Sequence, residues 1–497
     1  MKNFLLPVLI AIFICNSVTA QKLPGIQTGS SVDLTWDQMY ILGHDDDMVY
    51  VFRTMVEKQG AVAYIDGYSR KTLSRVSSNQ LIVPIVNADE FNVYETAAID
   101  GGVRVYYSFY SKKDDVKRVA AINIGKDGKP MGNAKELMRI DAKSEYRSGN
   151  IKFYFNKDTR QTLIANIAVK NMQETSPHTR VAIFGSGLER LVDTVLLFAP
   201  EEVHDFEIRR MFLDESANAY FVFNYRSKAL IMDDNLTFGS LNHVTHKFSS
   251  REFPHHKSSG GVDLRNTVEF QYNSKRDVLI AFQYSLMGVK YYDTYGFGVI
   301  KINGLTAAIE SSDYVPFMLD YKGERFKSPD DTKMADTYLQ SLHLDAEDNM
   351  YFATGRSTVT DKAAVWLKTD ASMKPLSQKF IPRKSDDFIP TLVMYHDNAT
   401  YYLYNDLPSN MAADVSAVEE IKSKSIKKGE VAPCVAVVTK DGTMTRKTLP
   451  INGNSTMGIL TGIYDIAGDS KEAYGFFKSQ DDEKEKNRYR LYHLAFE

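Results

Sequence analysis

The sequence predicts an all-β protein: a single β-propeller of about eight four-stranded antiparallel blades, with the ring closed by an N-terminal strand. Two observations predict it. One unit recurs eight times, as an apolar-aromatic strand, a short polar turn, a second strand rich in Tyr and Phe, and a third strand. The units are spaced by roughly 60 residues, slightly more than the 40–50 of a usual propeller blade. The second and third strands are also apolar at consecutive positions, as in YFVFNY (residues 220–225). Both faces of such strands are expected to be buried, which radial stacking of sheets provides and a lone sandwich does not.

Each unit begins with two strands joined by a polar turn. They are YILGHDDDMVYVF (40–52), AAIDGGVRVYYSF (97–109), FYFNKDTRQTLIA (153–165), MFLDESANAYFVF (211–223), VEFQYNSKRDVLIAF (268–282), LHLDAEDNMYFAT (342–354), LVMYHDNATYYLY (392–404) and IYDIAGDSKEAYGFF (463–477).

The third strand of each unit is apolar and usually ends in Asp, Asn or Gly, which tolerate the turns between antiparallel strands. These strands are AVAYIDG (61–67), VAAINIGKDG (119–128), VAIFGSG (181–187), ALIMDDN (229–235), GVIKING (298–304), VWLKTD (365–370), VAVVTKDG (435–442) and YRLYHLAFE (489–497). A weaker fourth strand is expected to follow, such as LIVPIV (81–86) or RLVDTVLLF (190–198).

The last unit stops at its third strand, so the ring needs a strand from elsewhere. Residues 29–34 (GSSVDL) are expected to supply it and so to remove an exposed sheet edge. The alternative is that this segment is a flexible tail. The blade count stays open by about one, because insertions blur the edges of the repeats.

Residues 1–20 are interpreted as a signal peptide, and residues 21–497 as the propeller, with a loop or helix insertion near 406–433. Lys2 precedes an apolar run, and Val18, Thr19 and Ala20 are small enough for cleavage before Gln21. The run is too short to span a bilayer, and no later stretch is long enough for a transmembrane segment. A lipid anchor on Cys15 is disfavoured by the bulky Ile14 before it.

The short charged start with Lys2 and the Ala20-Gln21 junction resemble those of exported proteins of the Bacteroidota group. In layout and repeat style, the mature chain resembles uncharacterised exported β-propeller-type proteins of that group. This resemblance implies a periplasmic, cell-surface or extracellular location, and it brings no catalytic residues. The mature chain holds one cysteine, Cys434, which is expected to be a buried inert thiol.

Net charge is −3 with both signs interspersed, so nucleic acid is excluded as an expected partner. The chain is too long to fold around one simple hydrophobic core. A ring of repeats avoids this limit because each unit buries its faces against its neighbours. We expect a monomer without a cofactor. The expected partner is a glycan, a peptide or an envelope protein.

Long connections are expected to gather on one face of the ring, here called the long-loop face. They are residues 248–266, 305–337 and 406–433, and each joins a second strand to a third or a fourth strand to the next unit. Because loops on a rigid scaffold often carry function, a ligand site is predicted there. Its candidate residues are His255, His256, Tyr291, Tyr292, Tyr295, Arg325, Asp330 and Asp331. The alternative is that these are solvated loop residues with locally packed tyrosines.

No metal site is expected. His243 and His246 lie close in sequence to His255 and His256, but SLNHVTHKF (residues 240–248) is interpreted as a fourth strand. Residues three apart on a strand point to opposite faces, so a shared metal is disfavoured.

Acidic pairs such as Asp330-Asp331 and Asp386-Asp387 precede several units. A carboxylate pair suits acid/base work on a glycosidic bond, but polar loops also collect acids. The first hypothesis is therefore an exported non-enzymatic propeller that binds a ligand or partner protein on its long-loop face. The alternative is a glycan hydrolase or lyase that uses acidic and His residues in the central funnel.

A helix is predicted over residues 412–425 (AADVSAVEEIKSKS), and it is expected to form a flap over the long-loop face.

Overall fold

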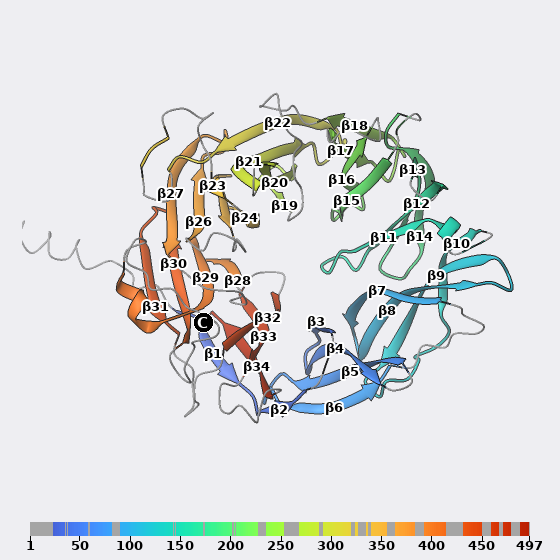
Figure 1. Cartoon of the computed structure of the whole chain (residues 1–497), viewed down its shortest axis with the longest axis horizontal. Coiled ribbons are helices and arrows are strands. Elements are labelled where there is room, and N and C mark those ends of the chain that lie inside the picture. Colours follow the sequence, from blue (N-terminus) through green and yellow to red (C-terminus); the bar gives the residue numbers. More distant parts are fainter. Residues whose placement is uncertain are drawn as a thin grey trace, which may run out of the picture.

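The computed structural model shows eight antiparallel sheets arranged in a ring (Figure 1). The structure describes residues 23–34, 36, 38–57, 60–81, 90–142, 144, 146–171, 174–200, 203, 205–226, 235–252, 268–287, 292–319, 324–326, 334–335, 339–354, 363–382, 392–413, 431–449, 459–466, 471–478 and 488–496. Within these residues the fold is the β-propeller that the repeats predict.

The strands of blades 1 to 4 follow the chain in order. Blade 1 contains β3 (Gln38–His44), β4 (Met48–Glu57), β5 (Gly60–Ser69) and β6 (Arg75–Gln80). Blade 2 contains β7 (Glu90–Ile99), β8 (Gly102–Ser111), β9 (Val116–Gly125) and β10 (Lys135–Asp141). Blade 3 contains β11 (Asn150–Phe155), β12 (Thr162–Asn171), β13 (Glu174–Phe184) and β14 (Arg190–Leu197). Blade 4 contains β15 (Asp205–Leu213), β16 (Ala219–Arg226), β17 (Asn235–Leu241) and β18 (Phe248–Glu252).

Blades 5 to 8 repeat the pattern. Blade 5 contains β19 (Val268–Tyr272), β20 (Val278–Met287), β21 (Tyr292–Ile302) and β22 (Ile309–Pro316), with β23 (Met334–Ala335) paired to β21. Blade 6 contains β24 (Leu339–Leu344), β25 (Met350–Thr354), β26 (Ala363–Thr369) and β27 (Pro375–Pro382). Blade 7 contains β28 (Leu392–His396), β29 (Ala399–Asp406), β30 (Ala432–Thr439) and β31 (Met444–Thr448). Blade 8 contains β32 (Ile459–Ile466), β33 (Glu472–Lys478), β34 (Arg488–Ala495) and β1 (Gly25–Thr28), with β2 (Val32–Asp33) also paired to β34.

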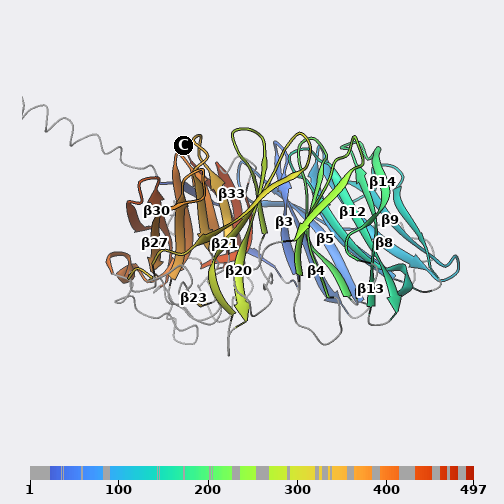
Figure 2. The same cartoon turned by 90° about the horizontal axis from the view of Figure 1, so that it is seen from above.

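The first strand of each blade lies nearest the axis of the ring, as Figure 1 shows. Seen edge-on, the blades stand side by side with their strands running between the two faces of the ring (Figure 2). Short 3-10 turns occur at η1 (Tyr146–Ser148) and η3 (Pro408–Ala412). No helix in the described part of the chain is long and apolar enough to cross a membrane.

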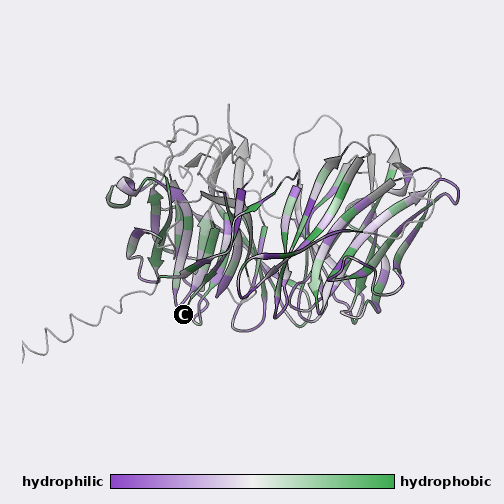
Figure 3. Ribbon diagram, turned by 90° about the horizontal axis from the view of Figure 1, so that it is seen from below, coloured by the Kyte–Doolittle hydropathy of each residue, from purple (hydrophilic) through white to green (hydrophobic). Residues whose placement is uncertain are grey.

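Hydrophobic clusters fill the interfaces between neighbouring blades. Tyr220 and Phe221 are adjacent on β16 and both fully buried: Tyr220 packs toward blade 5 and Phe221 toward blade 3. Consecutive apolar residues on the middle strands therefore serve two interfaces, which confirms the sequence interpretation. Figure 3 shows the resulting hydrophobic stretches along the strands.

The ring is closed by N-terminal residues, as the sequence predicts, but mainly by a different segment. Gly25–Thr28 forms β1 and pairs antiparallel with β34, whereas residues 29–34 contribute only the two-residue β2. The physical reason is Ile26, which pairs with Leu494 and is buried in the core between blades 7 and 8. Gly29, Ser30 and Ser31 offer no apolar side chain for that position.

A polar network spans the seam between the last and first blades. Glu472 on β33 accepts a hydrogen bond from His493 at 2.8 Å, and its other carboxylate oxygen lies 3.3 Å from His44 Nε2 of blade 1. Arg70 of blade 1 lies 3.2 Å from the same carboxylate and donates to the Tyr474 hydroxyl. Burial raises the pKa of Glu472, but His493, Arg70 and His44 outweigh it, so this pKa lies below its usual value.

Connection lengths differ between the two faces. Connections from first to second and from third to fourth strands are short, the longest running from Gly125 to Lys135. Residues 253–267, 317–338 and 407–431 join strand ends on the opposite face. The predicted asymmetry of connector length is therefore confirmed.

Two other expectations have different outcomes. The fourth strand of blade 1 is Arg75–Gln80 rather than residues 81–86. The predicted helix over residues 412–425 lies almost wholly outside the described residues.

Candidate functional site

Most residues of the predicted long-loop site lie outside the described part of the chain. These are His255, His256, Tyr291, Asp330 and Asp331. For Tyr292 the structure describes the backbone only. The prediction that these residues form a ligand site remains a prediction.

Tyr292 and Tyr295 lie in β21 and not in the loop before it. The pairing of Tyr292 with Met287 carries the hairpin further than the turn-like sequence suggests. The partly buried ring of Tyr295 packs against the core between blades 4 and 5. Arg325 is exposed and pairs through its backbone with Leu319.

His243 and His246 lie in the turn between β17 and β18, which corrects their assignment to a fourth strand. The third strand of blade 4 begins at Asn235, where the sequence pattern ends it, so the following turn is displaced. Asn218 holds this turn by accepting a hydrogen bond from the backbone N–H of His243 at 3.2 Å. Across the described ranges, no three His, Cys, Asp or Glu side chains are grouped so that they could hold a metal ion.

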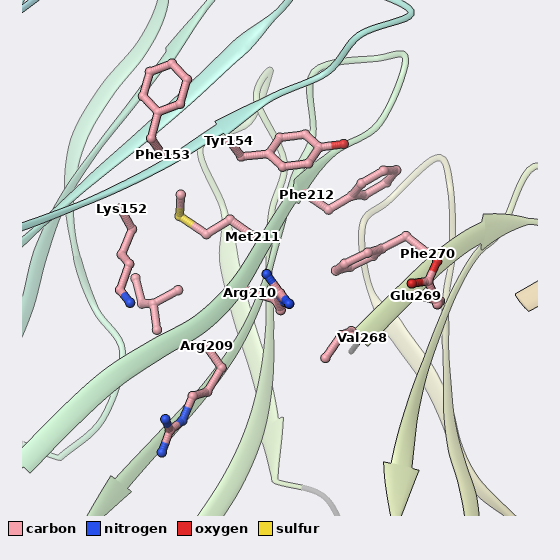
Figure 4. Close-up of a pocket in the computed structure, with 11 residues that line it drawn as sticks. Lys152, Phe153, Tyr154, Arg209, Arg210, Met211, Phe212, Val268, Glu269 and Phe270 are labelled. Atoms are coloured by element: carbon pink, nitrogen blue, oxygen red, sulfur yellow. The ribbon is translucent and has the colours of Figure 1, made fainter. Parts of the chain in front are cut away.

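A pocket of about 590 Å³ lies against the innermost strands of blades 3, 4 and 5 (Figure 4). It is lined by Lys152, Phe153, Tyr154, Ile208, Arg209, Arg210, Met211, Phe212, Val268, Glu269 and Phe270. All these residues lie on β11, β15 and β19, so strands paired within their blades hold the walls. The pocket therefore combines aromatic surface, cations and one carboxyl group on a rigid frame.

A shift in pairing places two arginines side by side in this pocket. On β15, Ile208 pairs with Phe223 and Arg210 with Val222, so Arg209 is an extra residue, as in a β-bulge. Ile208 and Met211 both face the blade 3 core across this shift. Arg209 and Arg210 are consequently both exposed, where regular alternation would send one of them into the core.

The pocket cations have different partners. Glu207 forms ion pairs with Arg209 at 2.9 Å and with Lys152 of blade 3 at 3.7 Å. Arg209 also donates to the side-chain oxygen of Asn224 at 3.0 Å. Arg210 has no hydrogen bond or ion pair to any described residue.

Aromatic rings from the three strands form a continuous wall. The rings of Phe212 and Phe270 are stacked, with centroids 4.5 Å apart and an interplanar angle of 10°. Tyr154 meets Phe212 edge-on at 5.7 Å. Figure 4 shows the stacked pair beside Glu269, with Arg210 on the same side of β15. An apolar ligand face would find contact area here next to charged groups.

Glu269 is the carboxyl group that lines the pocket, and it has no ion pair among the described residues. Burial raises its pKa to about 7, and the positive charge of Arg210 lowers it in part. No described residue hydrogen-bonds its side chain. Near neutral pH this group is therefore available either to donate or to accept a proton.

The pocket was not among the sites predicted from the sequence, although one signal for it is present. In DFEIRRMFL (residues 205–213) the apolar positions Phe206, Ile208, Met211 and Leu213 break the two-residue period between Ile208 and Met211. Such a break marks a bulge, and bulges often stand beside sites. The sequence around Lys152 and Glu269 gives no comparable signal. These residues come close to β15 only because the ring places blades 3 and 5 on either side of blade 4.

Comparisons with known proteins give fold-level likeness only. Similar solved structures include the polysaccharide lyase Uly1, with 10% identity and a TM-score of 0.39 over 93% of this chain and 100% of that chain. A post-proline cleaving enzyme from Rickettsia typhi shows 9% identity and a TM-score of 0.37, over 90% of this chain and 58% of that chain. A DUF4221 family member from Bacteroides vulgatus shows 10% identity and a TM-score of 0.27, over 67% of this chain and 93% of that chain. No protein family model and no curated protein matches the sequence. At these identities and scores the likeness carries no inference about activity.

Proposed function

We propose that this protein is an exported propeller that binds a saccharide in the pocket of blades 3, 4 and 5. The observation that carries the proposal is the stacked pair Phe212–Phe270 beside Arg210 in one pocket. A sugar ring has an apolar C–H face and a rim of hydroxyl groups. The aromatic wall suits the face, and the Arg, Lys and Glu side chains suit the rim.

Binding without turnover is favoured by the state of the carboxyl groups. Hydrolysis of a glycosidic bond ordinarily needs two carboxyl groups flanking the bond. Glu269 is the carboxyl group that lines the pocket, and the nearby Glu207 is held in ion pairs with Lys152 and Arg209. Glu269 also favours the second candidate, a glycan hydrolase or lyase, because a carboxyl group with a pKa of about 7 suits a general acid.

Export is part of the proposal and rests on the sequence. Lys2, the apolar run that follows and the small residues before Gln21 support cleavage of a signal peptide and a place in the periplasm or outside the cell. The mass of the protein isolated from the cell envelope or medium tests this. A mature chain beginning at Gln21 is expected, and an uncleaved chain in the cytosol would contradict it.

The binding proposal is tested with a panel of neutral and acidic tetrasaccharides, using titration calorimetry for affinity and mass spectrometry for products. Phe270→Ala removes half of the stacked pair and is expected to weaken binding about tenfold, or roughly 1–2 kcal/mol. Tyr40→Ala is the matched control, because Tyr40 is an exposed aromatic residue on the innermost strand of blade 1.

The outcomes separate the candidates. Weaker binding of Phe270→Ala with no product supports the binding module. Product that disappears in Glu269→Gln would favour the enzyme. If no saccharide binds, or Phe270→Ala binds like the wild type, the pocket is not the site.

A further inference from the structure

The charge of the pocket indicates which saccharide it takes, provided that the proposed function holds. Arg210 is exposed and forms no ion pair or hydrogen bond with any described residue, unlike Arg209 and Lys152, which share Glu207. A guanidinium presents two parallel N–H donors that match a carboxylate. Arg210 is therefore free to bind an anionic group of a ligand through two parallel N–H donors.

Glu269 stands on the neighbouring blade, near enough for the charge of Arg210 to lower its pKa. An ionised Glu269 would repel an anionic ligand, whereas a protonated one donates a hydrogen bond to it. The carboxylic acid form and Arg210 together offer donors from two blades to the same carboxylate.

We propose that the pocket binds a uronic acid residue of an acidic oligosaccharide, with its carboxylate held between Arg210 and protonated Glu269 and its ring beside Phe212 and Phe270. Binding is consequently strongest at mildly acidic pH and weakens as Glu269 ionises. A uronate keeps its own carboxylate ionised over this range, because carboxyl groups of that type titrate near pH 3–4. The pH dependence thus belongs to Glu269.

Other ionisable side chains lie on the strands packed around Glu269. Lys152, Glu207 and Arg209 form the ion pairs described above, on β11 and β15. On β24, which packs against β19, His343 has a pKa lowered by burial to about 4 and stays neutral. Burial raises the pKa of Tyr154 and of Tyr272 well above the usual tyrosine range. The described side chains of β20 include no ionisable group.

The test uses tetragalacturonate, its methyl ester and a neutral galactose tetramer as probes, by calorimetry at pH 6.0 and 8.5 and constant ionic strength. Tetragalacturonate is expected to bind up to about 30-fold more tightly at pH 6.0, the ratio of protonated Glu269 for a pKa of about 7. The methyl ester and the neutral tetramer are expected to bind at least tenfold more weakly than the acid at pH 6.0.

Variants of Arg210 and Glu269 show which residue is responsible for the affinity and which for its pH dependence. Arg210→Gln is expected to lose about 10- to 100-fold in affinity for tetragalacturonate, as for a hydrogen bond to a charged group. Arg210→Lys, which keeps the charge without the fork, is expected to recover part of it. Glu269→Gln keeps an N–H donor and is expected to bind equally at both pH values. Arg139→Gln, an exposed change on the outer strand β10, is the control.

The results distinguish this inference from the proposed function. If the neutral tetramer binds as tightly as the acid and Phe270→Ala weakens it, the pocket is a saccharide site but the uronate inference fails. Unchanged affinity in Arg210→Gln, or flat pH dependence in the wild type, also overturns the inference. Tighter binding of a peptide ending in a phenylalanine carboxylate would assign the pocket to peptides. No binding of any saccharide would end both proposals.

Discussion

Two aspartates show how burial decides the charge state of a side chain whose hydrogen bonds are alike. Asp214 and Asp345 each follow an innermost strand and accept hydrogen bonds from an Asn side chain and from a tyrosine hydroxyl. The pKa of Asp214 is raised because burial outweighs these bonds. For Asp345 burial also raises the pKa, but the hydrogen bonds outweigh it and the pKa is lowered. Hydrogen-bond geometry alone therefore does not fix the protonation of an acid in a blade turn.

The raised pKa of Glu269 is expected to make the free energy of unfolding depend on pH. Its pKa in the folded protein is raised to about 7, whereas an unfolded glutamate titrates near 4.5. The stability that this group contributes is fully present below pH 4.5 and is lost as the pH rises through 7. Glu269→Gln removes that loss, so its free energy of unfolding relative to wild type is expected to rise by about 1–3 kcal/mol between pH 4.5 and 8.

The measurement is chemical denaturation of both proteins at pH 4.5, 6 and 8. Glu252→Gln changes an exposed carboxyl group on the outer strand β18 and serves as the control, with the pH profile of the wild type expected. A Glu269→Gln profile parallel to that of the wild type would show that Glu269 titrates alike in the folded and unfolded states.

At the scale of elements, the blade turns reuse one device. Asp45, Asp214 and Asp345 each accept a hydrogen bond from a tyrosine hydroxyl on the second strand, at 2.7, 2.8 and 2.7 Å respectively. The acid also accepts backbone N–H groups of its own turn, as Asp345 does from Glu347 and Asn349. The turn and the strand after it are thereby fixed together, and the motif is legible in the sequence as an Asp five or six residues before a Tyr.

The bulge in β15 is an element-scale feature with a testable consequence. Deleting Arg209 leaves Phe206, Ile208, Met211 and Leu213 on one face of an unbroken strand. The free energy of unfolding is therefore expected to fall by no more than about 2 kcal/mol. Deleting Ile280 from β20, where pairing is continuous from Val278 to Tyr284, turns every later side chain to the wrong face and is expected to prevent folding.

Soluble yield and circular dichroism of the two deletion variants provide the comparison. Equal damage from both deletions would show that the register of β15 does not depend on the extra residue. A folded Arg209 deletion with a lower affinity for tetragalacturonate would show that the bulge serves the pocket more than the fold.

The fold was predictable from the sequence because its signals are local, and the pocket was not because its residues are distant. Consecutive apolar residues such as Tyr220 and Phe221 indicate a strand that is buried on both faces. Such strands are enough to predict a ring of stacked blades. Lys152, Arg210 and Glu269 come from three blades, and each alone resembles a solvated residue in a strand. Loop length directed attention to His255 and its neighbours, while the described pocket lies on strands. The connection that holds His255 nevertheless leads directly into β19, where the pocket wall begins.

At the scale of the whole molecule, the ring is held shut by non-covalent contacts between the two ends of the chain. Blade 8 packs on both blade 7 and blade 1, so loosening its N-terminal strand β1 disturbs the cores that it shares with both neighbours. β1 contributes four paired residues to β34, and the Glu472 network adds charged hydrogen bonds to blade 1. A ring of this kind is expected to unfold from its seam, as terminal repeats do in open arrays.

Ile26 tests that expectation, because it is the buried residue of β1, with 1% of its surface exposed. Ile26→Asp places an unpaired charge in the core between blades 7 and 8 and is expected to lower the melting temperature by about 5 °C or more. The adjacent Gln27 is exposed, so Gln27→Asp is the matched control and should leave the melting temperature unchanged. Hydrogen exchange reports where the ring opens: in Ile26→Asp the amides of β34 and β33 are expected to lose protection before those of β16. Loss of protection spread evenly over all blades would show that the seam is no weaker than any other interface.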